Sequence, residues 1–254
     1  MSSTTGPVPG PAAGPGGDRA AELGGALERL RARVAAAARA AGRDPAELTV
    51  VVVTKFFPAA DVRALAGLGV RDVGESRDQE ASAKAAELAP DHPQLRWHFV
   101  GQLQTNKCRS VARYARAVHS VDRPRLVAAL SSGASAAGRE LDCFVQVDLA
   151  GELGAPVDPA RGGAAGEDVL RLADAVAAAG ALRLAGLMAV APRGQDPARA
   201  FAALARTAAR VREAHPGAVH LSAGMSGDLE AAVAAGATHL RVGSAVLGTR
   251  PGAR

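Results

Sequence analysis

Short apolar runs alternate with amphipathic stretches along most of this chain. The run LTVVVVTK at 48–55 contains four consecutive valines, a pattern typical of a strand that is buried on both faces. Seven similar runs follow, so the predicted strands are 48–55, 70–76, 94–101, 115–122, 141–149, 182–190, 218–226 and 238–246. Helical periodicity precedes and separates them, and it predicts helices that include 18–42, 58–67, 76–89, 123–137, 196–214 and 227–235.

Strands that alternate with helices in this way favour parallel pairing, and eight parallel strands can close into a barrel. The alternative is an open doubly wound sheet, but no predicted strand is followed by a G-x-G-x-x-G turn. We therefore predict an α/β fold, a (β/α)8 TIM-like barrel in a single domain over 18–254, with an extra N-terminal helix. Residues 1–17 are rich in Gly, Pro and Ser, so we predict a disordered tail there.

Composition excludes several classes of protein. The first residues do not form a signal peptide, and no apolar run is long enough to cross a membrane. Two cysteines in 254 residues do not make a disulfide framework. The net charge of +5 invites a nucleic-acid interpretation, but the arginines are scattered near acids and the chain has one Trp and one Tyr. We expect a cytoplasmic protein that binds neither nucleic acid nor membrane.

Lysine is scarce in this chain, since only Lys55, Lys84 and Lys107 among the 30 basic residues are lysines. Arginine keeps its proton in proteins, whereas a buried lysine amine can lose it and attack a carbonyl group. Lys55 ends the first predicted strand, and barrel active sites lie at the C-terminal ends of strands. Lys55 is therefore the lysine placed for chemistry; the alternative is that its amine simply reaches water. Lys84 falls on a polar helix face, where we expect it to be solvated.

Glycine and serine stand at the ends of the last two predicted strands, the region where a TIM barrel commonly binds phosphate. Small residues let backbone amides approach an anion, serine hydroxyls donate to it, and a helix N-terminus adds a favourable dipole. The candidates are Ser222, Gly224, Met225 and Ser226 at the end of the seventh predicted strand, and Gly243 and Ser244 at the end of the eighth. The alternative for the first turn is plain helix capping by Ser226. Two such turns near a buried lysine favour a ligand that combines a phosphate with an aldehyde.

Arg241 lies two residues before Gly243, on the eighth predicted strand. If a pyridine ring lies between the phosphate and Lys55, Arg241 can donate a hydrogen bond to the ring nitrogen. A permanent positive charge there disfavours a proton on that nitrogen, which makes the ring a poorer electron sink. The alternative is an ion pair at the barrel rim, for example with Glu230.

Several segments together resemble the pyridoxal-phosphate homeostasis proteins, which are single-domain relatives of the alanine racemase barrel. The matching segments run in order from about residue 48 to residue 250 and are VVVTKFFP, DVGESRDQEA, WHFVGQLQTNK, VHSVDR, GLMAV and LSAGMSGDLEAAVAAGATHLRVGSAVLG. The resemblance implies pyridoxal 5'-phosphate as the cofactor, held as a Schiff base on Lys55, with its ring nitrogen at Arg241. It also implies phosphate contacts from Ser222, Gly224, Met225, Ser226, Gly243 and Ser244.

Two further residues of these segments are cofactor-binding candidates. His98 falls in the WHFVG segment, near the expected barrel mouth, where an ordinary strand-end histidine is the alternative. Ser76 stands where the family usually has asparagine, so we expect a weakened contact through its shorter hydroxyl.

The resemblance favours a non-catalytic carrier that binds, stores or delivers pyridoxal phosphate inside the cell. The alternative is a pyridoxal-phosphate-dependent amino-acid racemase, which needs a proton acceptor on each face of the substrate carbanion. Related racemases use a tyrosine and an additional domain; here the only tyrosine is Tyr114, in a helical stretch, and the chain ends shortly after the eighth predicted strand. We therefore expect a monomer without robust turnover, catalytic residues or a metal, which passes the cofactor to apo-enzymes that use it.

Overall fold

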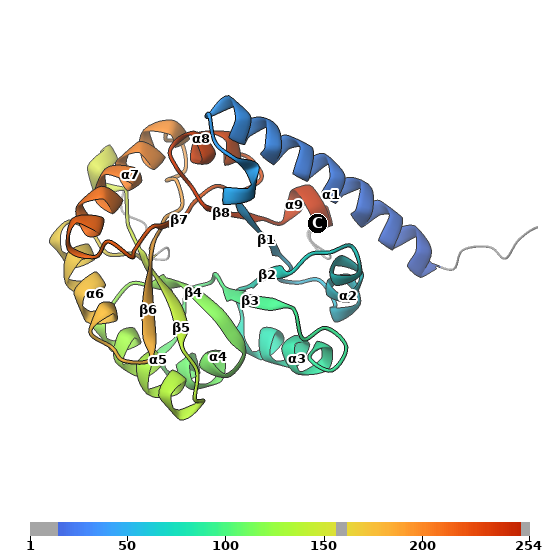
Figure 1. Cartoon of the computed structure of the whole chain (residues 1–254), viewed down its shortest axis with the longest axis horizontal. Helices are drawn as coiled ribbons and strands as arrows, with labels where there is room; N and C mark the ends of the chain where they lie inside the picture. Colours follow the sequence, from blue (N-terminus) through green and yellow to red (C-terminus); the bar gives the residue numbers. More distant parts are fainter. Residues whose placement is uncertain (1–14, 156–161, 250–254) are drawn as a thin grey trace, which may run out of the picture.

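The computed structural model describes residues 15–155 and 162–249. Parallel strands pair in chain order, and β8 returns to β1 so that the sheet closes into a barrel (Figure 1). The strands are β1 (Thr49–Val53), β2 (Asp72–Glu75), β3 (Arg96–Phe99), β4 (Ala115–Val121), β5 (Leu141–Gln146), β6 (Leu182–Met188), β7 (His220–Ser222) and β8 (His239–Val242). The predicted (β/α)8 fold is confirmed.

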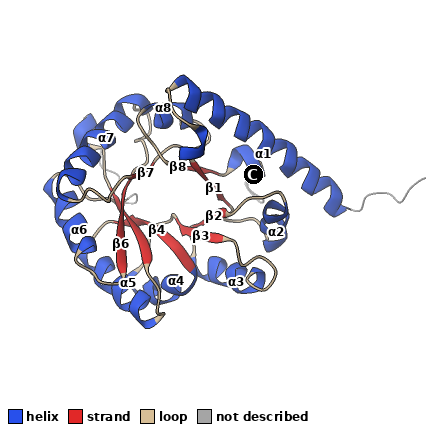
Figure 2. Cartoon of the chain, viewed as in Figure 1, coloured by secondary structure: helices blue, strands red, loops and turns tan. Residues whose placement is uncertain are grey.

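Helices surround the barrel on its outside (Figure 2). Helices α2 to α8 each lie between two consecutive strands, and α9 follows β8: α2 (Ala59–Gly67), α3 (Asp78–Leu88), α4 (Cys108–Tyr114), α5 (Pro124–Ala136), α6 (Glu167–Ala177), α7 (Pro197–Ala214), α8 (Leu229–Ala234) and α9 (Ser244–Leu247). Short 3-10 turns span Pro45–Glu47, Thr105–Lys107 and Gly151–Leu153. Across the described ranges, no helix combines the length and the apolar character needed to span a bilayer.

The extra N-terminal helix is present as α1 (Pro15–Ala40), which packs against α2, α8 and α9. It begins earlier than the predicted 18–42, because proline is well accommodated in the first turn of a helix. It ends at Ala40, two residues before the predicted end. The prediction of a disordered tail is therefore wrong for its last three residues, 15–17. The remainder of that prediction, 1–14, falls outside the described residues.

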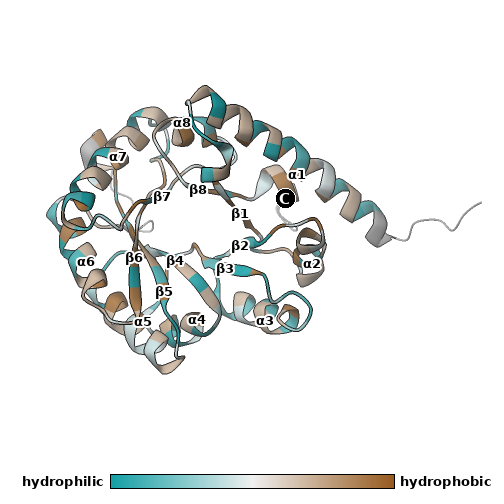
Figure 3. Ribbon diagram, in the orientation of Figure 1, coloured by the Kyte–Doolittle hydropathy of each residue, from teal (hydrophilic) through white to brown (hydrophobic). Residues whose placement is uncertain are grey.

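Two layers of apolar side chains hold the barrel, because alternate residues of a strand face opposite sides of the sheet. The larger layer lies between the strands and the helices and includes Val52 and its β2 partner Val73. A smaller cluster packs inside the barrel and consists of Ala117, Phe144, Ala185 and Met188. Figure 3 shows β1 hydrophobic along its length, whereas β3 carries hydrophilic residues. The inner cluster leaves much of the barrel interior to polar side chains.

Each observed strand is shorter than the run that predicted it. The run at 218–226 forms a strand only over His220–Ser222, because the chain turns at Gly224, whose φ is +90°. The run at 238–246 ends as a strand at Val242. The later residues of both runs lie in turns at the C-terminal face of the barrel and not in strands as predicted.

The pairing of β8 with β1 brings the predicted site residues together. Arg241 pairs with Val51 in this register. Gly243 lies against the end of β1, since a Cβ added to it would be 3.2 Å from the carbonyl oxygen of Val53. Lys55 follows Val53 by two residues, so Lys55 and the turn at Gly243 leave the barrel on neighbouring strands.

We expect Gly186→Ala to destabilise the barrel strongly. Gly186 has a φ of +151°, and an added Cβ would lie 1.8 Å from the carbonyl oxygen of His220. Strands β6 and β7 cannot both keep their places, so the free energy of unfolding in urea should fall by about 3 kcal/mol. Gly67→Ala in α2 is the matched control, because its added Cβ has no atom within 4 Å. An equal loss in the two variants would contradict this steric explanation.

Candidate functional site

Lys55 lies at the C-terminal face of the barrel, two residues after β1 ends at Val53. Its side chain is half-buried, and its Nζ lies 5.9 Å from the ring centroid of Phe56. Phe56 has a φ of 71° and is, among the described residues, the one residue other than glycine with a positive φ. This conformation costs roughly 1–2 kcal/mol, so surrounding contacts must hold the turn that directly follows Lys55.

A group of polar residues, buried except for the partly exposed Glu80, holds this turn; we call it the Lys84 cluster and define it as Lys84, Glu75, Glu80 and Thr54. The Nζ of Lys84 donates to Glu75 Oε1 at 2.8 Å and to Glu80 Oε1 at 2.7 Å. It also donates to the Thr54 carbonyl at 3.1 Å. Glu80 Oε1 accepts from the backbone N–H of Phe56 at 2.8 Å. Helix α3 is thereby tied to the backbone on both sides of Lys55.

The prediction that Lys84 is solvated is wrong, because its exposed fraction is only 6%. The helix face that carries it turns toward Glu75 at the end of β2, a contact between two different elements that helical periodicity cannot reveal. Burial raises the pKa of Glu75, and the hydrogen bonds from Lys84 and Thr54 oppose this shift only in part. Glu75 therefore depends on Lys84 to keep its charge.

The two glycine–serine turns meet at the C-terminal face. The Oγ of Ser244 lies 3.1 Å from the Oγ of Ser226, which also accepts from the backbone N–H of Ala245 at 3.3 Å. Gly224 has room for no side chain, since an added Cβ would lie 2.7 Å from the Cβ of Ala232. The hydroxyls of Ser226 and Ser244 thus form one polar patch, which is the arrangement expected of a phosphate site.

Helix capping does not explain Ser226, because α8 begins three residues later, at Leu229. Met225, the neighbouring candidate, is partly exposed, and its backbone N–H donates to Asp228 Oδ1 at 2.6 Å. Ser222 lies deeper than the patch and is fully buried. Its Oγ accepts a hydrogen bond from Arg241, so its hydroxyl is already bound to that side chain. A direct phosphate contact from Ser222 or from the Met225 amide remains a prediction that these hydrogen bonds do not favour.

Arg241 points into the barrel and is 6% exposed. Its Nη1 donates to Ser222 Oγ at 2.6 Å, and its Nη2 donates to the carbonyl oxygen of Ala189 at 2.9 Å. Within the described ranges no carboxylate forms an ion pair with it, and the rim pair with Glu230 is wrong because Glu230 binds Arg33 at 2.5 Å. Burial lowers the pKa of Arg241 to about 10, against the opposing charge of Asp228. The guanidinium therefore remains charged at neutral pH.

His98 and Ser76 occupy different positions from the other candidates. His98 is buried in the barrel, and its two ring nitrogens contact Asp72 and His119, each at 2.9 Å. The structure therefore does not bring His98 to Lys55.

Ser76 follows β2 and lines a cavity of about 760 Å³ whose basic residues are Arg77, Lys107 and Arg123. A cofactor contact from Ser76 remains a prediction.

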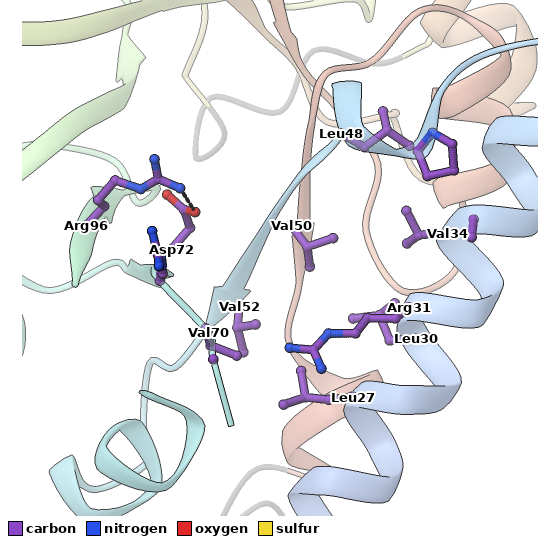
Figure 4. A pocket seen from close by; sticks show the side chains of 14 residues that line it. Leu27, Leu30, Arg31, Val34, Leu48, Val50, Val52, Val70, Asp72 and Arg96 are labelled. Carbon is purple, nitrogen blue, oxygen red and sulfur yellow. Dashed lines mark hydrogen bonds and ion pairs between the residues drawn. The ribbon is translucent and has the colours of Figure 1, made fainter. Parts of the chain in front are cut away.

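A second cavity, of about 410 Å³, lies between α1 and the outer face of β1 (Figure 4). Apolar side chains such as Leu27, Val50 and Val52 line most of it, and the ion pair of Asp72 with Arg96 borders one side. This cavity is outside the barrel and does not include Lys55.

In the part of the chain that the structure describes, no group of three His, Cys, Asp or Glu residues is placed to hold a metal ion.

Sequence reasoning missed the Lys84 cluster and the buried histidine His119. The signal for the first was the spacing of Glu80 and Lys84, four residues apart on one helix and therefore on one face. The signal for the second was a histidine within an apolar strand, in the segment ARAVHSVD. Neither signal names its long-range partner, which only the closed barrel supplies.

We expect Lys84→Met to lower the free energy of unfolding by about 3 kcal/mol near pH 8, because it leaves the Glu75 charge buried and unpaired. The folded pKa of Glu75 is raised, so its contribution to stability is present at low pH and is lost as the pH rises through that pKa. The deficit of the variant should therefore shrink as the pH falls toward about 5. Chemical denaturation at several pH values measures this.

The double variant Lys84→Met with Glu75→Gln removes the unpaired charge and should recover much of the loss. Lys107→Met changes an exposed lysine and should be nearly neutral. A deficit that is independent of pH and remains in the double variant would show that Lys84 acts through packing alone.

The chain matches the family model of the alanine racemase N-terminal domain over residues 26–251. It is 45% identical over 248 residues to a pyridoxal phosphate homeostasis protein of Mycobacterium leprae, a match that covers 91% of this chain and 94% of the relative. The corresponding protein of Mycobacterium tuberculosis is 46% identical over 250 residues, with coverages of 92% and 95%. PipY of Synechococcus elongatus, solved with PLP bound, superposes with a TM-score of 0.73 at 34% identity, covering 89% of this chain and 100% of PipY. This chain therefore belongs to the alanine racemase N-terminal domain family and, within it, to the pyridoxal phosphate homeostasis proteins.

Proposed function

We propose that this protein binds pyridoxal 5'-phosphate and serves its homeostasis by binding, storing or delivering it, rather than by catalysing a reaction. The observation that carries the proposal is Arg241, a buried cation without a carboxylate partner in the described ranges, on the strand next to that of Lys55. A fixed guanidinium is a suitable donor to a neutral pyridine nitrogen. The name of the relatives and the PLP bound to PipY support the same ligand.

The side chains present fit this cofactor in three respects. Lys55 offers a half-buried amine for the aldehyde carbon. The hydroxyls of Ser226 and Ser244, with the backbone N–H of Ala245 beside them, suit the phosphate. Arg241 suits the ring nitrogen. When bound, pyridoxal phosphate supplies an electrophilic aldehyde and a ring that can accept electrons.

The absence of turnover is the second part of the proposal, and it depends on where other bases lie. Tyr114 lies in a groove between α3 and α4, on the outside of the barrel, and its hydroxyl donates to Asp78 at 3.4 Å. Burial also raises its pKa, so the phenolate that could accept a proton is scarcely populated. His98 uses both ring nitrogens within the barrel. Neither side chain is therefore available as the second proton acceptor that racemisation at Lys55 requires.

Delivery of the cofactor to apo-enzymes, by a protein that acts as a monomer, completes the proposal. Lys55 is only half-buried, and Ser244 is exposed at the face where the two turns meet. A ligand at this face can leave without any movement of the barrel strands. The relatives' name, which refers to homeostasis, is consistent with such exchange.

Borohydride reduction tests the attachment site. Protein incubated with pyridoxal phosphate and then reduced should carry the cofactor on Lys55 in peptide mass spectrometry. Lys55→Ala should lose the covalent label but keep weaker binding, because the two turns still hold the phosphate. Lys107→Ala is the control and should label normally. Label found on Lys84 or Lys107 in the wild type would refute the assignment.

Proton exchange tests the absence of catalysis. Protein loaded with pyridoxal phosphate is incubated in heavy water with a panel of L- and D-amino acids, and NMR follows the loss of their α-protons. We expect rates far below about 1 per second, which is the lower range of ordinary enzymes, because neither Tyr114 nor His98 is available as a second base at Lys55. Exchange at ordinary enzymatic rates for any amino acid would establish the racemase alternative instead.

A further inference from the structure

A continuous chain of hydrogen bonds crosses the barrel interior and ends at Arg241. We call it the axial relay and define it as Asp72, His98, His119, Ser222 and Arg241. Asp72 Oδ1 contacts His98 Nε2 at 2.9 Å, and His98 Nδ1 contacts His119 Nε2 at 2.9 Å. His119 Nδ1 contacts Ser222 Oγ at 2.8 Å, and Ser222 Oγ accepts from Arg241 at 2.6 Å. Every member is buried, and Asp72 is the first residue of β2, at the N-terminal end of that strand.

The donors in the relay follow from its two ends. A guanidinium can only donate, so Ser222 Oγ accepts from Arg241. At the other end Asp72 is a charged acceptor that turns the proton of each histidine toward it, so His119 Nδ1 accepts the hydrogen of Ser222. His119 then carries its proton on Nε2 and donates to His98 Nδ1. His98 in turn carries its proton on Nε2 and donates to Asp72. Each ring is neutral in this order and both of its nitrogens are satisfied. Burial, together with the charge of Arg241, also keeps the pKa of His119 well below its usual value.

Asp72 is the residue that sets this order. Its second oxygen, Oδ2, pairs with Arg96, as the dashed line in Figure 4 shows. Burial raises the pKa of Asp72, but the hydrogen bonds from His98 and Arg96 outweigh that effect and leave the pKa below its usual value. Asp72 is therefore a charged group that accepts on both oxygens, and His98 must donate to it.

We propose that His98 and His119 are positioning residues for Arg241, and that Asp72 orders them from the opposite end of the barrel. In this order the hydrogen of Ser222 is held toward His119, which fixes the direction of the lone pairs that accept from Arg241. Ser222 and the Ala189 carbonyl then occupy two of the five N–H groups of the guanidinium. No other hydrogen bond from this guanidinium is formed within the described ranges, so the remaining N–H groups can donate to a ligand. That this ligand is the ring nitrogen of pyridoxal phosphate rests on the proposed function.

The half-buried histidines of the barrel, His220 and His239, do not belong to the relay. His239 packs edge-on against Phe144 and its Nδ1 contacts Thr238 Oγ1 at 2.9 Å. His220 lies beside His239, with ring centroids 5.0 Å apart. Asp142, the other acid at the same end of the barrel, pairs with surface arginines. These residues lie in the same barrel interior but form none of the hydrogen bonds of the relay, so they provide matched controls.

The first test uses Asp72→Asn in the protein without added cofactor. Arg96 requires an acceptor, so the amide oxygen should face Arg96 and the amide NH₂ should face His98 Nε2. His98 must then accept at Nε2 and donate from Nδ1, which moves the proton of His119 from Nε2 to Nδ1. Nitrogen NMR of the imidazoles reads this change directly. The variant Asp142→Asn should leave the His119 proton on Nε2. A His119 proton on Nδ1 in the wild type, or on Nε2 in Asp72→Asn, would overturn the relay.

The second test examines Arg241 itself, in protein loaded with pyridoxal phosphate labelled with ¹⁵N in its ring. We expect His119→Leu to shift the ring-nitrogen resonance and to weaken binding about tenfold, since one buried hydrogen bond of Ser222 is lost. His119→Gln keeps one donor and one acceptor and should restore both readouts, while His220→Gln should change neither. An unshifted resonance in His119→Leu would overturn the positioning role.

The two tests separate the inference from the proposed function. The tautomer measurement needs no cofactor, so its failure counts against the relay alone. If wild-type protein does not bind pyridoxal phosphate, the proposed function is refuted, and the tautomer of His119 in Asp72→Asn still decides whether the relay exists.

Discussion

A positive charge buried inside a barrel has to be balanced from within, and Arg241 imposes this requirement on the centre of the structure. Its guanidinium is met by Ser222 and by a backbone carbonyl rather than by a carboxylate. Satisfying Ser222 then requires His119, and satisfying His119 requires His98. Branched aliphatic side chains usually fill the interior of a TIM barrel. Here one side of the interior is instead polar, because the buried charge of Arg241 needs Ser222 as a hydrogen-bond partner, and each buried partner in turn needs another.

A second buried cation lies on the other side of the same barrel wall. Lys84 belongs to α3, and its amine lies between that helix and β2. It donates one hydrogen bond to the Thr54 carbonyl and pairs with Glu75 and Glu80. Lys55 therefore leaves the barrel between two fixed charges, with Arg241 on the inside and Lys84 on the outside. Both charges are desolvated, so each is costly to leave unpaired. We infer that this cost gives the turn at Lys55 its definite geometry, despite the strained φ of Phe56.

These features bear on why a barrel related to racemases would act as a carrier. A permanent cation at the ring nitrogen disfavours the protonated ring that stabilises carbanions most strongly. The buried histidines, which could otherwise move protons, are committed to holding that cation. In the proposed function the same set of hydrogen bonds thus keeps the cofactor bound while limiting its reactivity toward amino acids.

The sequence by itself determined the alternation of strands and helices, the barrel and the small residues of the two turns. These properties are local, since burial on both faces selects valine and tight turns select glycine. It also singled out Lys55 and Arg241, because few other residue types can do their chemistry. Only the tertiary structure decided that Lys84 is buried and that His98 belongs to a chain ending at Arg241. Those residues meet across strands and helices many positions apart, and periodicity says which face a side chain takes but not which distant side chain it meets there.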